Sequence, residues 1–148
     1  MTDPFAVPTA RQPSPLALVN AVRAEVDAWR DGGYPGASAT TRRLLEHWFL
    51  DQHRTTRGQP FAYYFAQREA IETIVYLHEV AGVRSTDGLL ARYPQRPVAA
   101  AGQPFPRYVV KMATGSGKTK VMSLAIAWAY FHALREEGSA LSPTSLVV

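Results

Sequence analysis

The chain has 148 residues, the length of about one domain, with 47% apolar and 19% charged residues. This ordinary globular usage excludes a chain that is disordered throughout, a fibre or a coiled coil. The absence of Cys excludes disulfides and thiolate metal sites and favours a cytoplasmic protein, and a net charge of +4 permits a polyanionic partner without proving one.

The amino-terminal part is predicted to be helical. Residues 1–13 are rich in Pro and small residues and are expected to form a mobile leader. Ser14 and Pro15 then suit the N-cap and first position of a helix that runs to about residue 30. A second helix is expected from Thr40 or Thr41 towards Gln52. The two helices define a helical region over residues 14–58.

An aromatic, possibly extended segment at residues 61–65 leads into a predicted helix over residues 66–81, with Gly82 as its C-terminal cap. Residues 83–106 contain several Pro and Gly and are expected to form a long surface connection.

The pattern then changes to alternating strand and helix. Residues 107–112 predict a buried strand, residues 113–119 a loop, and residues 118–137 a helix that is apolar nearly all round and ends at Gly138. This helix is shorter than the roughly 20 apolar residues of a membrane span, so no membrane partner is expected. A second strand begins at Thr144. The predicted fold is α/β, with the start of a parallel sheet over residues 61–148. Because the sequence stops within that strand, we expect an amino-terminal fragment of a longer protein.

The loop between the first strand and the long helix has the residues of a P-loop. It reads Met112-Ala-Thr-Gly-Ser-Gly-Lys-Thr119. Residues without a Cβ let backbone N–H groups approach phosphate oxygens, and the N-terminus of the following helix favours an anion. The predicted ATP contacts are Thr114, Gly115, Ser116, Gly117, Lys118 and Thr119. Lys118 is the expected catalytic residue, reaching the β- and γ-phosphates, and the Thr119 hydroxyl is expected to hold Mg²⁺. The general pattern begins with Gly, whereas this chain has Met112 there.

A second candidate is Gln67, near the start of the helix at residues 66–81. Its amide can donate and accept hydrogen bonds together, as the edge of an adenine base requires. A Gln in that position is as often a solvated surface residue, so the assignment depends on the P-loop downstream.

Gln67-Arg-Glu-Ala70 followed by residues 112–119 resembles the Q motif and motif I of superfamily 2 helicases. The form Met-Ala-Thr-Gly-x-Gly-Lys-Thr is most similar to DEAD/DEAH-box proteins related to the restriction subunit of type III restriction enzymes. The resemblance covers about residues 40–148. It implies that the P-loop lies in the first of two RecA-like domains of an ATP-dependent helicase or translocase.

The resemblance also implies parts and partners of the whole protein. The acidic pair of motif II, the arginine finger and any endonuclease domain would lie beyond Val148, so this piece alone is expected to be inactive. The implied partners are nucleic acid, DNA rather than RNA, and a methylation or specificity subunit of a restriction or defence system.

Two other functions stay open from the sequence. One is a P-loop kinase for a small molecule, although about a hundred residues precede the P-loop here. The other is a non-catalytic interaction fragment in which the helices at residues 14–82 dock on a partner. The aromatic residues at 48–49 and 61–65 could stack nucleobases, but burial is the more common role of large aromatics.

Overall fold

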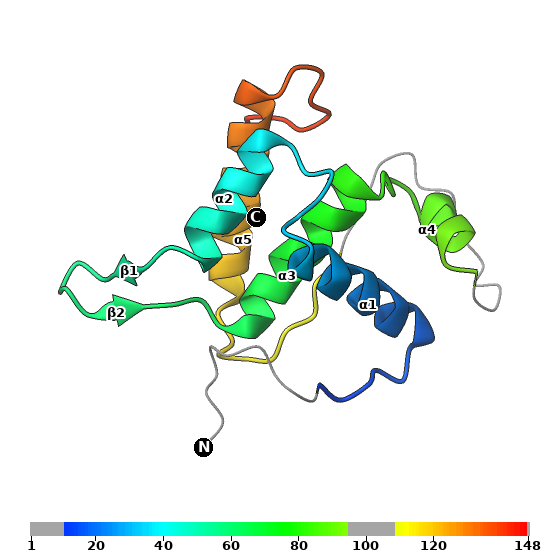
Figure 1. The fold of residues 1–148 in the computed structure, drawn as a ribbon, viewed down its shortest axis with the longest axis horizontal. Helices are drawn as coiled ribbons and strands as arrows, with labels where there is room; N and C mark the ends of the chain where they lie inside the picture. Colours follow the sequence, from blue (N-terminus) through cyan, green and yellow to red (C-terminus); the bar gives the residue numbers. More distant parts are fainter. Residues whose placement is uncertain (1–10, 95–108, 148) are drawn as a thin grey trace. The chain divides into compact units, whose positions relative to one another are not determined.

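The computed structural model describes residues 11–94 and 109–147 (Figure 1). Two predicted segments therefore lie partly outside the described residues: the leader at residues 1–10 and the surface connection at residues 95–106. The described residues divide into two compact units. One contains residues 37–71 and 112–147, and the other contains residues 11–36, 72–94 and 109–111.

The first unit is built on two helices, α2 (Ala39–Phe49) and α5 (Lys118–Arg135). The Ser38 hydroxyl accepts a hydrogen bond from the Thr41 N–H at 3.2 Å and so satisfies an otherwise unpaired donor in the first turn of α2. A short antiparallel hairpin follows α2, with β1 (His53–Arg54) paired to β2 (Pro60–Phe61). Helix α3 (Phe65–Val75) begins in this unit and continues into the other.

Helices α2 and α5 lie side by side and share a core (Figure 1). The buried apolar side chains between them come from both helices: Leu45, Trp48, Val121, Leu124 and Trp128. Two polar contacts fix their register. The Trp128 indole N–H donates to the Thr41 hydroxyl at 2.9 Å, and the Glu136 carboxylate accepts from the Thr40 N–H at 2.9 Å. The second contact lowers the pKa of Glu136, because the hydrogen bonds from Thr40 favour the ionised carboxylate.

The second unit contains α1 (Ala17–Asp31), the π-helical turn η1 (Tyr76–Val80) that continues α3, and α4 (Thr86–Arg92). Its apolar core includes Val26, Trp29 and Val75. The side chain of Glu72 is fully buried within this core. It is 2.6 Å from the Arg30 guanidinium and accepts a hydrogen bond from the Tyr34 hydroxyl at 2.6 Å.

Several element boundaries differ from the sequence predictions. Helix α1 begins at Ala17 rather than Pro15, because Ser14 is held in a turn by two hydrogen bonds with the Asn20 side chain. The predicted helix at residues 66–81 becomes π-helical at Tyr76. Gly82, with φ of +64°, follows its end as predicted. The predicted surface connection contains α4, whose N-cap Ser85 accepts from the Gly88 N–H.

The predicted strands at residues 107–112 and 144–148 do not form within the described residues, 109–112 and 144–147. Of the described residues, only the β1–β2 pair forms a sheet. A strand needs neighbours for its backbone groups, and three or more strands are usually needed for a stable sheet. The helix predicted to be apolar nearly all round has exposed rings in α5: Tyr130 and Phe131 are 43% and 37% exposed.

No helix in the described ranges combines the length and apolar character needed to cross a membrane.

Candidate nucleotide-binding site

The backbone of residues 113–118 turns sharply into the N-terminus of α5. Gly115 and Gly117 both have φ of +79°, a left-handed conformation that residues with a Cβ rarely adopt. Gly117 is the N-cap of α5 and has no side chain to cap the first turn. No side chain caps the N–H groups of that turn, although the Lys120 N–H donates to the Gly117 carbonyl at 2.9 Å. The helix dipole favours an anion at this end of α5. These features fit the phosphate chain of a nucleotide.

Lys118 lies across the loop rather than away from it. Its ammonium group donates to the Ala113 carbonyl at 3.1 Å, and the Ser116 hydroxyl donates to the same oxygen at 2.6 Å. One carbonyl thus holds both side chains against the loop while Lys118 stays exposed.

The predicted Mg²⁺ ligand, Thr119, lies in the first turn of α5 and is exposed. A hydroxyl oxygen in that place suits a hard cation that keeps most of its water ligands. Within the described ranges, no group of three or more Asp, Glu or His side chains is placed to hold a metal ion.

The structure brings Gln67 to the P-loop. This side chain is buried, at 4% exposure. Its Nε2 donates to the Ser116 carbonyl at 3.0 Å, and its Oε1 accepts from the Tyr64 N–H at 3.0 Å. The amide therefore links the start of α3 to the loop, and its donor and acceptor already have partners within the protein.

The same contact explains the glycine at position 117. A Cβ placed there would overlap Gln67 Nε2, whereas a Cβ at Gly115 would meet no atom within 4 Å. Position 117 therefore favours glycine for two reasons: its positive φ and the close approach of the Gln67 side chain. Gly115 is required for its φ alone.

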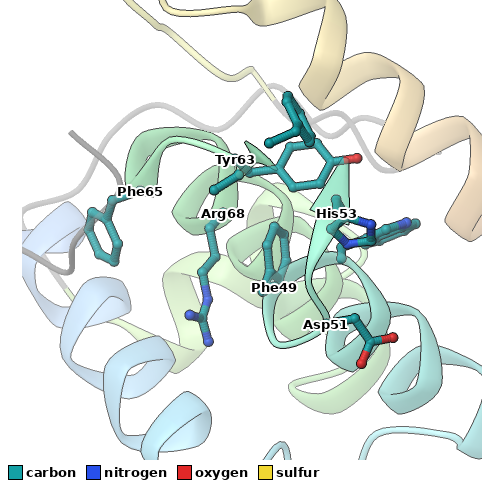
Figure 2. Close-up of a pocket in the computed structure, with 9 residues that line it drawn as sticks. Phe49, Asp51, His53, Tyr63, Phe65 and Arg68 are labelled. Atoms are coloured by element: carbon teal, nitrogen blue, oxygen red, sulfur yellow. The ribbon is translucent and has the colours of Figure 1, made fainter. Parts of the chain in front are cut away.

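A second feature, which the sequence did not single out as a site, lies at the base of the hairpin (Figure 2). We call it the hairpin pocket; its volume is about 100 Å³ and its lining includes Phe49, Asp51, His53, Phe61, Tyr63 and Arg68. The signal in the sequence is the density of aromatics at residues 61–65, but spacing alone did not distinguish a lined pocket from a closed core.

The aromatic rings of this pocket meet edge to face. The Tyr63 ring centroid lies 5.6 Å from that of Phe49 and 4.9 Å from that of Phe61. Partial burial raises the pKa of Tyr63, because the charged phenolate is poorly solvated there.

One comparison with known proteins gives a match. The family described as "Type III restriction enzyme, res subunit" matches residues 61–148, which include Gln67, the P-loop and α5. No curated protein and no solved structure gives a significant match.

Proposed function

Because this chain belongs to the type III restriction enzyme res subunit family, we propose that it is the ATP-binding part of an ATP-dependent helicase or translocase that acts on DNA. The family is one of helicase-type ATPases with a RecA-like fold. We place the start of the ATP-binding domain at residues 61–148. Residues 14–58 would form a preceding helical region.

The observation that carries this proposal is the loop ahead of α5. Residues 115–118 combine three features: two glycines with positive φ, a helix N-terminus without a side-chain cap, and an ammonium group. Each of these features favours a polyphosphate, and together they are the parts of a P-loop.

Within this site the residues have separate roles. The N–H groups that follow Thr114, Gly115 and Ser116 would bind the phosphate oxygens, and Lys118 would neutralise the charge that develops on the transferred phosphoryl group. Gln67 would act on the nucleotide through the loop backbone that it holds. Thr119 would be a ligand of Mg²⁺, which neutralises phosphate charge when it is bound.

Hydrolysis in such enzymes also needs an acidic pair that orients water and an arginine from a second domain. We therefore propose that these 148 residues bind nucleotide without turning it over. In the whole protein, DNA binding and a methylation or specificity subunit would complete a restriction-type assembly.

The test is nucleotide binding by the chain and by its Lys118→Ala variant, measured by calorimetric titration with Mg-ATP and by thermal unfolding. Arg135→Ala, which removes a cation at the other end of α5, is the matched control. We expect the parent and the control to melt at a higher temperature with Mg-ATP, because a ligand that binds only the folded state stabilises it. Lys118→Ala should lose at least tenfold in affinity. An unchanged affinity in that variant would contradict the proposal.

A further inference from the structure

The β1–β2 hairpin extends away from the end of α2, and its tip is a short loop at residues 55–59 (Figure 1). Every residue of this tip is exposed. The match to the res subunit family begins at residue 61, so membership of the family assigns no role to the tip. A role for the tip must therefore follow from its own shape and charge.

Hydrogen bonds within the tip hold the loop together. The Thr55 N–H donates to the Gln59 carbonyl at 2.8 Å, and the Gly58 N–H donates to the Thr55 carbonyl at 2.8 Å. The Thr55 hydroxyl also accepts from the Gln59 N–H at 3.2 Å. Thr56 and Arg57 take no part in these bonds. A partner that contacts these two residues meets a loop that is already ordered, which lowers the entropic cost of binding.

The hairpin carries positive charge without acidic residues around it in the sequence. Residues 52–68 contain no Asp or Glu, whereas Arg54 lies in β1 and Arg57 lies at the tip. Both arginines are exposed, and within the part of the chain that the structure describes neither forms an ion pair. Arg54 Nη1 donates to a backbone carbonyl across the loop at 2.8 Å, which leaves its other N–H groups for a partner. The Lys120 ammonium, 5.5 Å from the centroid of the Phe61 ring, adds a third cation at the base of the hairpin.

The chemistry of the hairpin favours the backbone of duplex DNA as its partner. Guanidinium groups bind phosphate oxygens through two hydrogen bonds at once, and hydroxyls such as that of Thr56 are common phosphate contacts. Sites for single strands stack bases on aromatic rings, but residues 54–60 contain no aromatic residue. The major groove of B-form DNA admits a two-stranded ribbon, whereas the major groove of an RNA duplex is too narrow for side chains.

We propose that the β1–β2 hairpin is a contact arm for duplex DNA, in which Arg54 and Arg57 bind backbone phosphates and Lys120 adds attraction at the base. Because the contacts are to phosphates, the arm does not select a sequence. The choice of DNA rests on the function proposed above, whereas the cationic surface does not. The contact also needs no nucleotide in the P-loop.

The experiment measures the binding of a short labelled duplex of mixed sequence to the full chain by fluorescence anisotropy, without nucleotide and at several salt concentrations. The main variant is Arg57→Gln, and Arg54→Gln tests the second phosphate contact. Arg57→Lys keeps the charge at the tip. Arg135→Gln is the matched control, because it removes an exposed cation in the last turn of α5. Thermal unfolding of each variant without DNA shows whether it remains folded.

The expected result is a change in salt dependence. Each phosphate contact contributes about 0.9 to the slope of log affinity against log salt, because binding releases condensed counterions. Arg57→Gln should therefore reduce this slope by about 0.9 and weaken binding roughly eightfold at about 0.1 M salt. Arg54→Gln should have the same effect. Arg57→Lys should keep the slope of the parent, and Arg135→Gln should keep both its slope and its affinity.

Unchanged slopes in both Arg57→Gln and Arg54→Gln would overturn the proposal. Charges that only keep an exposed strand edge from pairing with another chain would give that result. The absence of duplex binding by the parent at low salt would also overturn it.

Two further probes test the class of the partner. The parent should bind a single-stranded oligothymidylate and polyglutamate more weakly than the duplex. Equal affinity for either probe would show a general attraction to polyanions and would contradict the proposal. Failure of the nucleotide-binding proposal is distinguishable, because the parent would then not bind Mg-ATP, whatever its affinity for the duplex.

Discussion

Replacing Gly117 by Ala should destabilise the chain more than replacing Gly115 by Ala, even without nucleotide. Both glycines have φ of +79°. A residue with a Cβ in the left-handed region costs roughly 1–2 kcal/mol, so both variants should lose that much. At Gly117 the new Cβ also overlaps Gln67 Nε2.

The extra cost at Gly117 follows from what Gln67 must give up. Its amide is the end of a flexible side chain and can move, but it then loses its hydrogen bond to the Ser116 carbonyl. A net contribution of about 1 kcal/mol is typical of such a bond. Gly117→Ala should therefore lower the free energy of unfolding by about 2–3 kcal/mol, about 1 kcal/mol more than Gly115→Ala.

This difference can be measured by urea denaturation of four variants. They are Gly115→Ala, Gly117→Ala, Gln67→Ala and the double variant Gln67→Ala with Gly117→Ala. Once Gln67 is removed, Gly117→Ala should cost only the backbone strain, so the cycle should show a coupling of about 1 kcal/mol. Equal losses at the two glycines, together with additive effects in the cycle, would refute the close approach of Gln67 to the loop.

Two further predictions concern the second unit. Glu72→Ala removes a fully buried carboxylate partner of the Arg30 guanidinium, while Asp27 remains in contact with that guanidinium at 2.7 Å. The variant should cost about 1.5–3 kcal/mol in urea denaturation, the range for losing hydrogen bonds to a charged group, and a loss below about 1 kcal/mol would show that the pair does not form. Glu25 is partly buried, which disfavours its charge, but hydrogen bonds from Tyr93, Tyr76 and Arg92 outweigh this and lower its pKa. Because that pKa is lower in the folded than in the unfolded chain, the stabilisation is present above the ordinary value near 4.5 and is lost as pH falls through the folded value. The melting temperature of the parent should thus fall more steeply below pH 4.5 than that of Glu25→Gln, and parallel curves would contradict this assignment.

The sequence alone determined the local features of this protein. Its apolar spacing predicted the helices around residues 15–30, 40–52, 66–81 and 118–137, and each is present with shifted ends. The glycine-rich loop before α5 was also predicted, because a close approach of the backbone to an anion requires Gly at fixed positions. The left-handed conformation of its glycines came from the structure. The match to the res subunit family confirms the resemblance to that family that residues 67–70 and 112–119 indicate.

Only the tertiary structure decided which distant residues meet. No spacing rule joins Gln67 to Ser116, Thr41 to Trp128 or Glu72 to Arg30, because each contact depends on how helices pack rather than on local periodicity. The strands at residues 107–112 and 144–148 were predicted from apolar runs, but a strand forms only beside a partner. The hairpin pocket likewise needed three segments in one place, since the same aromatics could equally have filled a closed core.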